Sequence, residues 1–348
     1  LEARKKALLL RAQLASTPVH PSASHSHALP RTCDSPTATE ALSLRSLLNQ
    51  WQQTKRPSQD TYRACELAVE AYLQLHGLRD VGIADITRQD GQRFASELLS
   101  QCHSRKTAHG KLTWVKSLLN FAVETLDAIA KSPWKGIEIK YSKTTQRRVW
   151  SDHEITKLLT ATRQLSLSTQ APKRSGGLAA YWLPLLALHT GARLSELAQL
   201  TPSDISQEPD GYWLTITDAG DDQNIKSTNS KRKIPLHSDL MRAGFIDYWT
   251  AQRNQSSLWP ELPKRQGKAG GYFSNWFNQF VKSIGLEKLD FHSFRHTFRT
   301  HLVVANTPET AIDSLMGHAI FGNVGKSRYT HIHSKLRSYL ERIKYVID

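Results

Sequence analysis

Cysteine and long apolar runs are both scarce in this sequence of 348 residues. The three cysteines are odd in number and far apart, with no Cys-x-x-Cys pair among them: Cys33, Cys65 and Cys102. This usage favours a reducing cytoplasm over a disulfide framework, and it argues against a zinc site. The longest apolar run near the N-terminus, residues 7–10, is too short for a membrane span or a signal-peptide core. We therefore expect a soluble protein with no membrane partner.

Acidic residues are scarce relative to basic ones. The sequence has 46 Lys and Arg against 31 Asp and Glu, which gives a net charge of +15. This excess fits a protein that binds a polyanion with a strong dependence on salt, although a generic basic protein is the alternative on charge alone. Hydrophobic residues make up 39% of the chain, which is enough for the cores of two domains.

The sequence begins with Leu rather than Met, which we interpret as the start of a fragment of a longer chain. Residues 1–40 join a short basic helical pattern to a stretch rich in Ser, Thr, Pro, His and Ala. This composition predicts a flexible N-terminal segment and linker. Three histidines gather there, and we interpret them as a chance cluster rather than a metal site: His20, His25 and His27.

Residues 41–139 show helical spacing throughout. Apolar stripes near 44–51, 62–73, 86–99 and 114–122 predict four helices. Basic residues gather at the beginning of the fourth: Arg105, Lys106, His109, Lys111 and Lys116. These side chains suit contacts with DNA phosphates, but they also fit the solvated face of an unrelated helical bundle.

Residues 140–150 predict a linker with basic side chains available for phosphates: Lys140, Lys143, Arg147 and Arg148. The following Ser-x-x-Glu pattern, residues 151–154, is typical of a helix capping box. A second domain is therefore expected at 151–348. Strand-like alternation is confined to about 211–237, so the fold class is mainly α with a small antiparallel β-sheet.

Two cations of the second domain lie in settings suited to a phosphate. Arg193 follows a Thr-Gly break and is predicted in the first turn of a helix, where unpaired backbone N–H groups favour an anion. Lys226 lies between two strand-like stretches and is predicted at the tip of a hairpin. The run 231–233 is also basic, so the alternative to a catalytic role for Lys226 is a solvent-exposed basic hairpin.

Four more polar residues follow in the chain. His292 and Arg295 are three apart, on one face of a predicted helix whose other face carries two phenylalanines, Phe294 and Phe298. His318 follows a predicted helix with Thr307 as its N-cap, Pro308 at its first position and Gly317 beyond its end. Tyr329 comes eleven residues after His318.

Together these six residues suit phosphoryl transfer. Two guanidiniums can bind the non-bridging oxygens of a phosphodiester, where one well-placed donor is often worth ~3 kcal/mol in the transition state. Both histidines can add hydrogen bonds to the same phosphate. Tyr329 is the candidate nucleophile, His292 the candidate acceptor of its proton, and Lys226 the candidate donor to the leaving oxygen. This chemistry requires no metal and no other cofactor.

The order of these residues resembles that of the tyrosine recombinases of the phage-integrase and Xer type. The family pattern Gly-x-Arg-x-x-Glu-Leu corresponds to residues 191–197. The family also has a hairpin Lys followed by x-Pro-Leu, which corresponds to Lys226 and residues 234–236. The His-x-x-Arg, Gly-His and final Tyr motifs follow at 292–295, 317–318 and Tyr329. The likeness covers roughly 41–348, and only the stretch between His318 and Tyr329 is longer than usual.

The resemblance decides between several candidates. It favours Lys226 over Lys231 as the general acid, and Tyr329 over Tyr339 and Tyr345, which fit a helical packing stripe. It suggests that Glu196 orders the active-site histidine, whereas the residues alone also allow a simple pairing with a cation. Residues 41–139 correspond to the core-binding domain of the family, and the segment from 334 would dock on a neighbouring protomer or fold back onto its own domain.

What the resemblance implies is a site-specific recombinase or integrase that cleaves and rejoins DNA through a 3′-phosphotyrosyl intermediate and a Holliday junction. Its expected partners are duplex DNA, three further protomers in a homotetramer, and an accessory directionality factor. A mobile element and the nucleoid of a prokaryotic host are the expected setting. Two alternatives remain: the same chemistry in a type IB topoisomerase or telomere resolvase, and a non-catalytic DNA-binding regulator.

Overall fold

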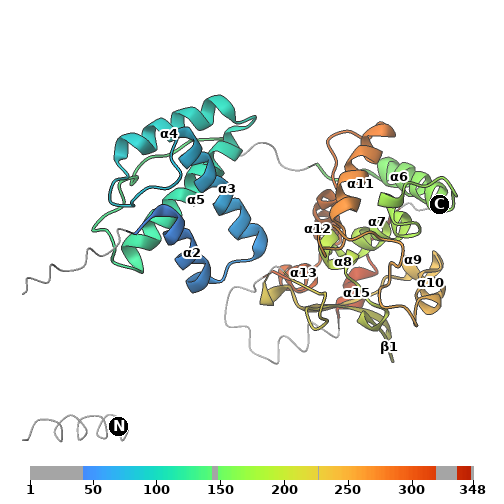
Figure 1. The fold of residues 1–348 in the computed structure, drawn as a ribbon. Helices are drawn as coiled ribbons and strands as arrows, with labels where there is room; N and C mark the ends of the chain where they lie inside the picture. Colours follow the sequence, from blue (N-terminus) through green and yellow to red (C-terminus); the bar gives the residue numbers. More distant parts are fainter. Residues whose placement is uncertain (1–41, 143–147, 226, 319–334, 346–348) are drawn as a thin grey trace, which may run out of the picture. The chain divides into compact units, whose positions relative to one another are not determined.

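The computed structural model describes residues 42–142, 148–225, 227–318 and 335–345 (Figure 1). The chain divides into two compact units, residues 1–143 and 144–348. The predictions for residues 1–40 lie outside the described residues, as do those for Lys143 and Arg147. No helix in the described ranges has the length and hydropathy needed to cross a bilayer.

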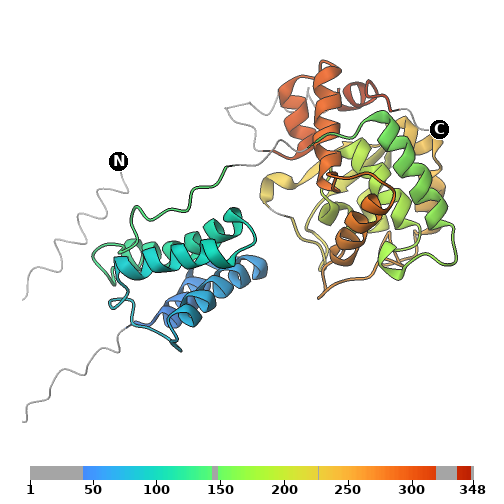
Figure 2. The same cartoon turned by 90° about the horizontal axis from the view of Figure 1, so that it is seen from above.

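The first unit contains four helices, one for each predicted stripe: α2 (Leu44–Lys55), α3 (Gln59–Leu75), α4 (Arg88–Gln101) and α5 (Arg105–Glu124). Figures 1 and 2 show them as one bundle from two directions. Each begins after a Ser or Thr whose side chain accepts a backbone N–H of the first turn. The third helix begins at Arg88, where Thr87 and Asp90 form a capping box, and Ile86 is buried ahead of it.

The residues after α5 return to cover the first unit. Trp134 is fully buried. Its ring meets that of Tyr72 edge-on and that of Phe94 at a tilt, and its indole N–H donates to the carbonyl of Thr87 at 3.0 Å. Ile139 is buried in the same core. The first unit therefore extends to the beginning of the predicted linker.

The division between the two units falls within the predicted linker, 140–150. Tyr141 packs on His109 in the first unit, with ring centroids 4.9 Å apart. Trp150 is buried in the core of the second unit, where its backbone N–H donates to Thr297 at 2.9 Å. Tyr141 thus lies against a side chain of the first unit, and Trp150 lies in the core of the second.

The second unit is built around α7 (Ala179–Thr190), in which every residue is buried. Helices α6 (Asp152–Ser166) and α12 (His292–Val304) pack against it. A helix buried on all sides needs neighbours around its whole circumference. The remaining helices of the described unit are α8 (Leu194–Ala198), α9 (Ser238–Arg242), α10 (Phe245–Ala251), α11 (Gly271–Ser283), α13 (Glu309–Met316) and α15 (Leu336–Leu340).

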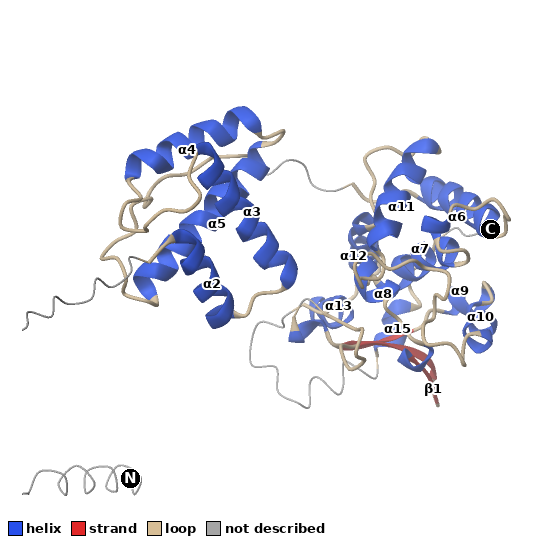
Figure 3. Cartoon of the chain, viewed as in Figure 1, coloured by secondary structure: helices blue, strands red, loops and turns tan. Residues whose placement is uncertain are grey.

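A small antiparallel sheet lies among these helices (Figure 3). Its order is β1 (Ile205–Glu208), β2 (Gly211–Ile216) and β3 (Arg232–Pro235), and Leu214 pairs with Ile205 on one side and Ile234 on the other. The mainly α fold class with a small antiparallel sheet is confirmed. The expectation that strands begin near 211 is wrong, because the polar strand β1 adds to β2 through backbone pairing.

The C-terminal segment lies on its own domain in the single chain. Arg337 on α15 donates to the carbonyls of Tyr212 and Leu236, each at 3.0 Å. The Glu341 carboxylate accepts from the backbone N–H of Ser238 at 2.9 Å. The buried Tyr345 donates its hydroxyl to the carbonyl of Leu188 at 2.8 Å. The tyrosine predicted to serve packing therefore does so.

Candidate active site

Arg193 is placed by the turn between α7 and α8. Gly191 ends α7 with φ of 60°, and a Cβ there would lie 2.4 Å from a ring carbon of Phe298, so only glycine fits without displacement. Arg193 is then the N-cap of α8. The sequence had predicted it further on, in the first turn of the helix. Its backbone N–H donates to Glu196 at 2.9 Å, which closes the capping box at the beginning of α8.

The buried Glu196 carboxylate pairs with two arginines, of which Arg193 is partly exposed and Arg232 is buried. Glu196 is 2% exposed and accepts from Nη1 of Arg193 at 2.5 Å and from Nη2 of Arg232 at 2.9 Å. Burial alone would raise the pKa of Glu196, but the charges and hydrogen bonds of Arg232 and Arg193 lower it below its usual range. Of the two sequence interpretations of Glu196, the structure shows the pairing with cations.

Arg295 is the most buried of those predicted cations that lie in the described ranges, with 4% of its surface exposed. Nη1 donates to the carbonyl of Gly191 at 2.7 Å, and Nη2 to that of Met316 at 2.5 Å. Burial, reinforced by the charges of Arg193 and Arg232, lowers the pKa of Arg295 to about 10. Arg295 still carries its charge at neutral pH, in a place where a bound anion would offset repulsion between like charges.

His318 completes this cluster. Its Nε2 lies 3.0 Å from Nη2 of Arg295, and its Nδ1 lies 3.2 Å from a carboxylate oxygen of Asp313. Because a guanidinium only donates, Nε2 accepts in this arrangement, and Nδ1–H donates to Asp313. The side chain is 41% exposed, so His318 joins the buried Arg295 to the surface of the domain.

The helix before His318 begins differently from the prediction. Pro308 is the N-cap of α13, and the buried hydroxyl of Thr307 has no hydrogen-bond partner. Pro308 has extended backbone dihedrals, φ −56° and ψ 140°, so the helix begins one residue later, at Glu309. Gly317 ends α13 with φ of 65°, as expected for a residue beyond the last turn.

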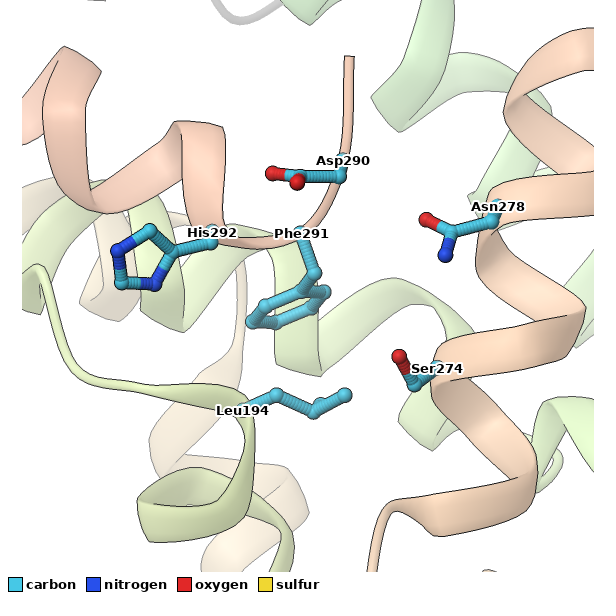
Figure 4. A pocket seen from close by; sticks show the side chains of 6 residues that line it. All are labelled: Leu194, Ser274, Asn278, Asp290, Phe291 and His292. Carbon is cyan, nitrogen blue, oxygen red and sulfur yellow. The ribbon is translucent and has the colours of Figure 1, made fainter. Parts of the chain in front are cut away.

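His292 opens α12 on the wall of a pocket (Figure 4). Leu194 from α8 and two polar side chains from α11 face the same pocket, which is lined by Leu194, Ser274, Asn278, Asp290, Phe291 and His292. The ring of His292 lies 5.2 Å from that of His296, at 77°. Phe294 and Phe298 are fully buried, which confirms that they anchor the helix that presents His292 and Arg295.

Lys226 and Tyr329 lie outside the described residues, as does the stretch 319–328 before the tyrosine. Their competitors are described. Lys231 pairs with Asp218 at 2.6 Å. The guanidinium carbon of Arg342 lies 5.0 Å from the ring centroid of Tyr339. Burial raises the pKa of the Tyr345 hydroxyl.

The basic residues predicted to bind DNA fall into two groups. Arg105 and Lys106 are exposed and Lys111 is half-buried. Lys116, in contrast, donates to the carbonyl of Ile137 at 2.6 Å, and Arg148 pairs with Glu154 at 2.7 Å. Since each of these two side chains is already bound to an acceptor within the protein, Lys116 and Arg148 are weaker candidates for phosphate contacts than the sequence suggested.

Arg232 is the functional candidate that the sequence did not reveal. It stands between two lysines in a hairpin, where the sequence indicated a solvated basic run. In the structure its side chain is 3% exposed. The only local sign of this burial is the alternation that puts it on the same side of β3 as Ile234, two residues later.

One group within the described ranges has the spacing of metal ligands: His189, His237 and Asp239, all buried. Hydrogen bonds already engage it, because Nδ1 of His237 accepts the backbone N–H of Asp239 at 3.0 Å and Nε2 lies 3.1 Å from the carbonyl of Ile343. Nδ1 of His189 lies 2.9 Å from the carbonyl of Leu185. We interpret the group as a polar network that supports the C-terminal segment.

Solved structures share this arrangement of helices and sheet. An integrase of the Tn1549 transposon, in complex with a circular intermediate DNA, gives a TM-score of 0.60 at 17% identity, over 85% of this chain and 100% of that one. A lambda integrase tetramer bound to a Holliday junction gives 0.59 at 18% identity, over 93% of this chain and 89% of that one. At these identities the likeness establishes the fold.

Proteins that are similar in sequence are recombinases by name. A "tyrosine recombinase XerC-like" protein of Caldanaerobacter subterraneus subsp. tengcongensis is 24% identical, over 85% of this chain and 81% of its own length. A "tyrosine recombinase XerC" of Roseiflexus castenholzii is 25% identical, over 79% and 84%.

Fold and relatives define a class of enzyme, the tyrosine-type site-specific DNA recombinases. The model of the phage integrase family matches residues 149–335, more than half of the chain. The chain therefore belongs to the phage integrase family.

Proposed function

We propose that the protein cleaves and rejoins DNA at specific sites through a covalent link between Tyr329 and a 3′-phosphate. The phenol oxygen of Tyr329 forms a bond to the scissile phosphorus while the bond to the sugar 5′-oxygen breaks. His292 takes the phenol proton and Lys226 gives a proton to the departing oxygen. A 5′-hydroxyl of the partner duplex later reverses the step, so the bond energy is conserved and no cofactor is consumed.

The observation that carries this proposal is the cluster of Arg193, Arg295 and His318. Both guanidiniums are fixed before any substrate arrives, one by Glu196 and the other by two backbone carbonyls. Such donors stabilise developing negative charge without reorganising during the reaction. Burial, reinforced by the charges of Arg193 and Arg232, lowers the pKa of Arg295 to about 10. A phosphodiester bound there would offset the repulsion between these cations.

His318 is the third member of this cluster. In the structure its Nε2 accepts from Arg295, and its Nδ1–H donates to the carboxylate of Asp313. We infer that this carboxylate orients the ring toward the substrate phosphate.

We infer that recombination requires four protomers on two duplexes, with strands exchanged in pairs through a Holliday junction. The lambda integrase structure contains a tetramer on such a junction, which supports this assembly. We also propose that the reaction serves integration, excision or resolution of a mobile element under an accessory directionality factor. The organisms of the relatives support a bacterial cytoplasm as the setting. The basic residues Arg105, Lys106 and Lys111 would bind backbone phosphates.

A nicked suicide substrate tests the chemistry, because loss of a short 5′-hydroxyl strand traps the covalent intermediate. The full chain should form a protein–DNA adduct that resists denaturant. Tyr329→Phe should bind DNA with unchanged affinity and form no adduct, while Tyr345→Phe serves as the matched control. Adduct formation by Tyr329→Phe would disprove the assignment, and no adduct with the unaltered protein on any bound site would favour a regulator without chemistry.

Two-site substrates separate recombination from topoisomerase activity. Exchange of flanking DNA between two sites supports the proposal. Relaxation of supercoiled DNA without exchange would instead assign the same site to a topoisomerase.

A further inference from the structure

Arg232 on β3 is a buried cation that the mechanism above does not use. All three nitrogens of its guanidinium are engaged: Nε donates to the carbonyl of Leu315 at 2.8 Å and Nη1 to that of Ser230 at 2.8 Å. Nη2 donates to Glu196 at 2.9 Å. The planar fork thus joins three segments that are far apart in the sequence, which a point charge on a flexible stem could not do.

Each of the two distant segments carries a residue of the candidate site. Glu196 binds both the backbone and the guanidinium of Arg193. Leu315 lies three residues before His318, and a Cβ on the intervening Gly317 would lie 2.9 Å from Nη1 of Arg232. The backbone that leads to His318 therefore rests directly on this guanidinium.

Charge explains why an arginine occupies this place. Glu196 is almost fully buried, and burial by itself would raise the pKa of its carboxyl. Among the groups that lower the pKa of Glu196, Arg232 has a larger effect than Arg193. Without Arg232, a carboxyl in this position would take up a proton more readily and would hold Arg193 less firmly.

We propose that Arg232 is a positioning residue for strand cleavage, which acts by holding Glu196 against Arg193 and by fixing the end of α13 that leads to His318. This inference rests on the proposed function. It adds a residue that does not touch DNA but on which the geometry of two phosphate-binding groups depends.

The variant Arg232→Gln tests this role. We expect single-turnover cleavage of the suicide substrate to fall by about 100-fold, as for a displacement of roughly 1 Å in catalytic groups. DNA affinity should hold, since Arg232 is buried. The loss should be greater at pH 6 than at pH 8, because a Glu196 deprived of Arg232 is protonated as the pH falls through its raised pKa. The loss is measured at each pH as the ratio of the variant's cleavage rate to that of the unaltered protein, so that pH effects common to both cancel.

Two further variants identify the route of the effect. In Arg232→Gln combined with Glu196→Gln, the loss should be smaller than the product of the single losses, and the decline at acid pH should disappear. Lys233→Gln is the matched control on the same strand, because its partner is Glu208 at the edge of the sheet. This control should cleave at the rate of the unaltered protein.

Thermal unfolding shows whether Arg232→Gln is folded. If Arg232→Gln is unfolded, Arg232→Lys is measured instead, because lysine keeps the charge but lacks the planar fork of donors. Slower cleavage by Arg232→Lys with intact DNA binding supports the proposal, and an unchanged cleavage rate contradicts it. Unchanged rate and pH profile in a folded Arg232→Gln, or additive losses in the double variant, would overturn the inference. Failure of the unaltered protein to form any adduct would refute the proposed function itself.

Discussion

Two pairs of basic side chains, one pair in each unit of the molecule, are held in opposite ways. In the first unit, Arg105 and Lys106 at the beginning of α5 are exposed, and their side chains form no hydrogen bond or ion pair with any described residue. In the second, Arg232 and Arg295 are each less than 10% exposed and donate to backbone carbonyls from distant segments. The first pair offers charge to its surroundings, and the second fixes charge in the core.

This difference separates binding from chemistry. Exposed cations act through their number, and screening by salt reduces their contribution. A buried guanidinium acts through its position, because its hydrogen bonds leave one orientation and its charge is screened little. Substitutions in the first unit should therefore change how tightly DNA is held, whereas conservative substitutions in the second should change how fast it is cleaved.

The largest effect is expected for Arg295→Lys, which keeps the charge and removes the fork. A single ammonium cannot reach both the carbonyls and a phosphate, so single-turnover cleavage should fall by about 100- to 1,000-fold. Arg299→Lys on the same helix is the control, because Arg299 is exposed and pairs with Glu309. A cleavage rate for Arg295→Lys equal to that of the control would show that charge alone suffices in the second unit.

A smaller loss is expected for Asp313→Asn, which removes the carboxylate beside Nδ1 of His318. A hydrogen bond to a charged group is commonly worth about 1.5–3 kcal/mol, which corresponds to about 10- to 100-fold in rate, and we expect the lower end because the pair is partly exposed. Cleavage of the suicide substrate measures the effect, with Glu309→Gln on the same helix as control. Equal rates for the two variants would remove Asp313 from the mechanism.

In the first unit, the joint change of Arg105 and Lys106 to Gln should alter affinity and leave cleavage of saturated substrate unchanged. Each lost phosphate contact lowers the slope of log K against log salt by about 0.9, so two contacts give about 1.8. Binding titrations over a range of salt measure this slope. Lys116→Met, whose ammonium donates to Ile137, should leave the slope unchanged; a change there would show that Lys116 does bind DNA.

The smallest effect is expected from Ser104→Ala at the N-cap of α5. Loss of the hydrogen bond to the backbone of Thr107 should lower the free energy of unfolding by about 1 kcal/mol. Denaturant titration measures this change, and Ser100→Ala, within α4 rather than at a cap, is the comparison. Slower cleavage by a Ser104→Ala variant that is still folded would contradict the separation of DNA binding in the first unit from chemistry in the second.

Local sequence patterns predicted the parts of the molecule that depend on local physics. The stripe of Leu44, Leu47, Leu48 and Trp51 and the pair Phe294 and Phe298 are buried as their helical spacing indicated. Helical spacing fixes which side chains share a face, whatever the rest of the chain does.

Residues whose setting depends on distant partners could not be predicted in this way. Arg232 looked like one of three exposed cations, and only Glu196 and the carbonyl of Leu315 make its burial favourable. Strand β1 has few apolar residues and is defined by its pairing with β2. Arg193, Arg295 and His318 were found through their order in the chain, while the contacts that orient them became visible only in three dimensions.

Mapping the trapped adduct by mass spectrometry tests the central claim most directly. After digestion of the protein–DNA adduct by protease and nuclease, a nucleotide should remain on the peptide that contains Tyr329, joined through its 3′-phosphate. A nucleotide on Tyr339, on Tyr345 or on a serine would contradict the proposed phosphotyrosyl mechanism, however closely the arginines resemble a phosphate site.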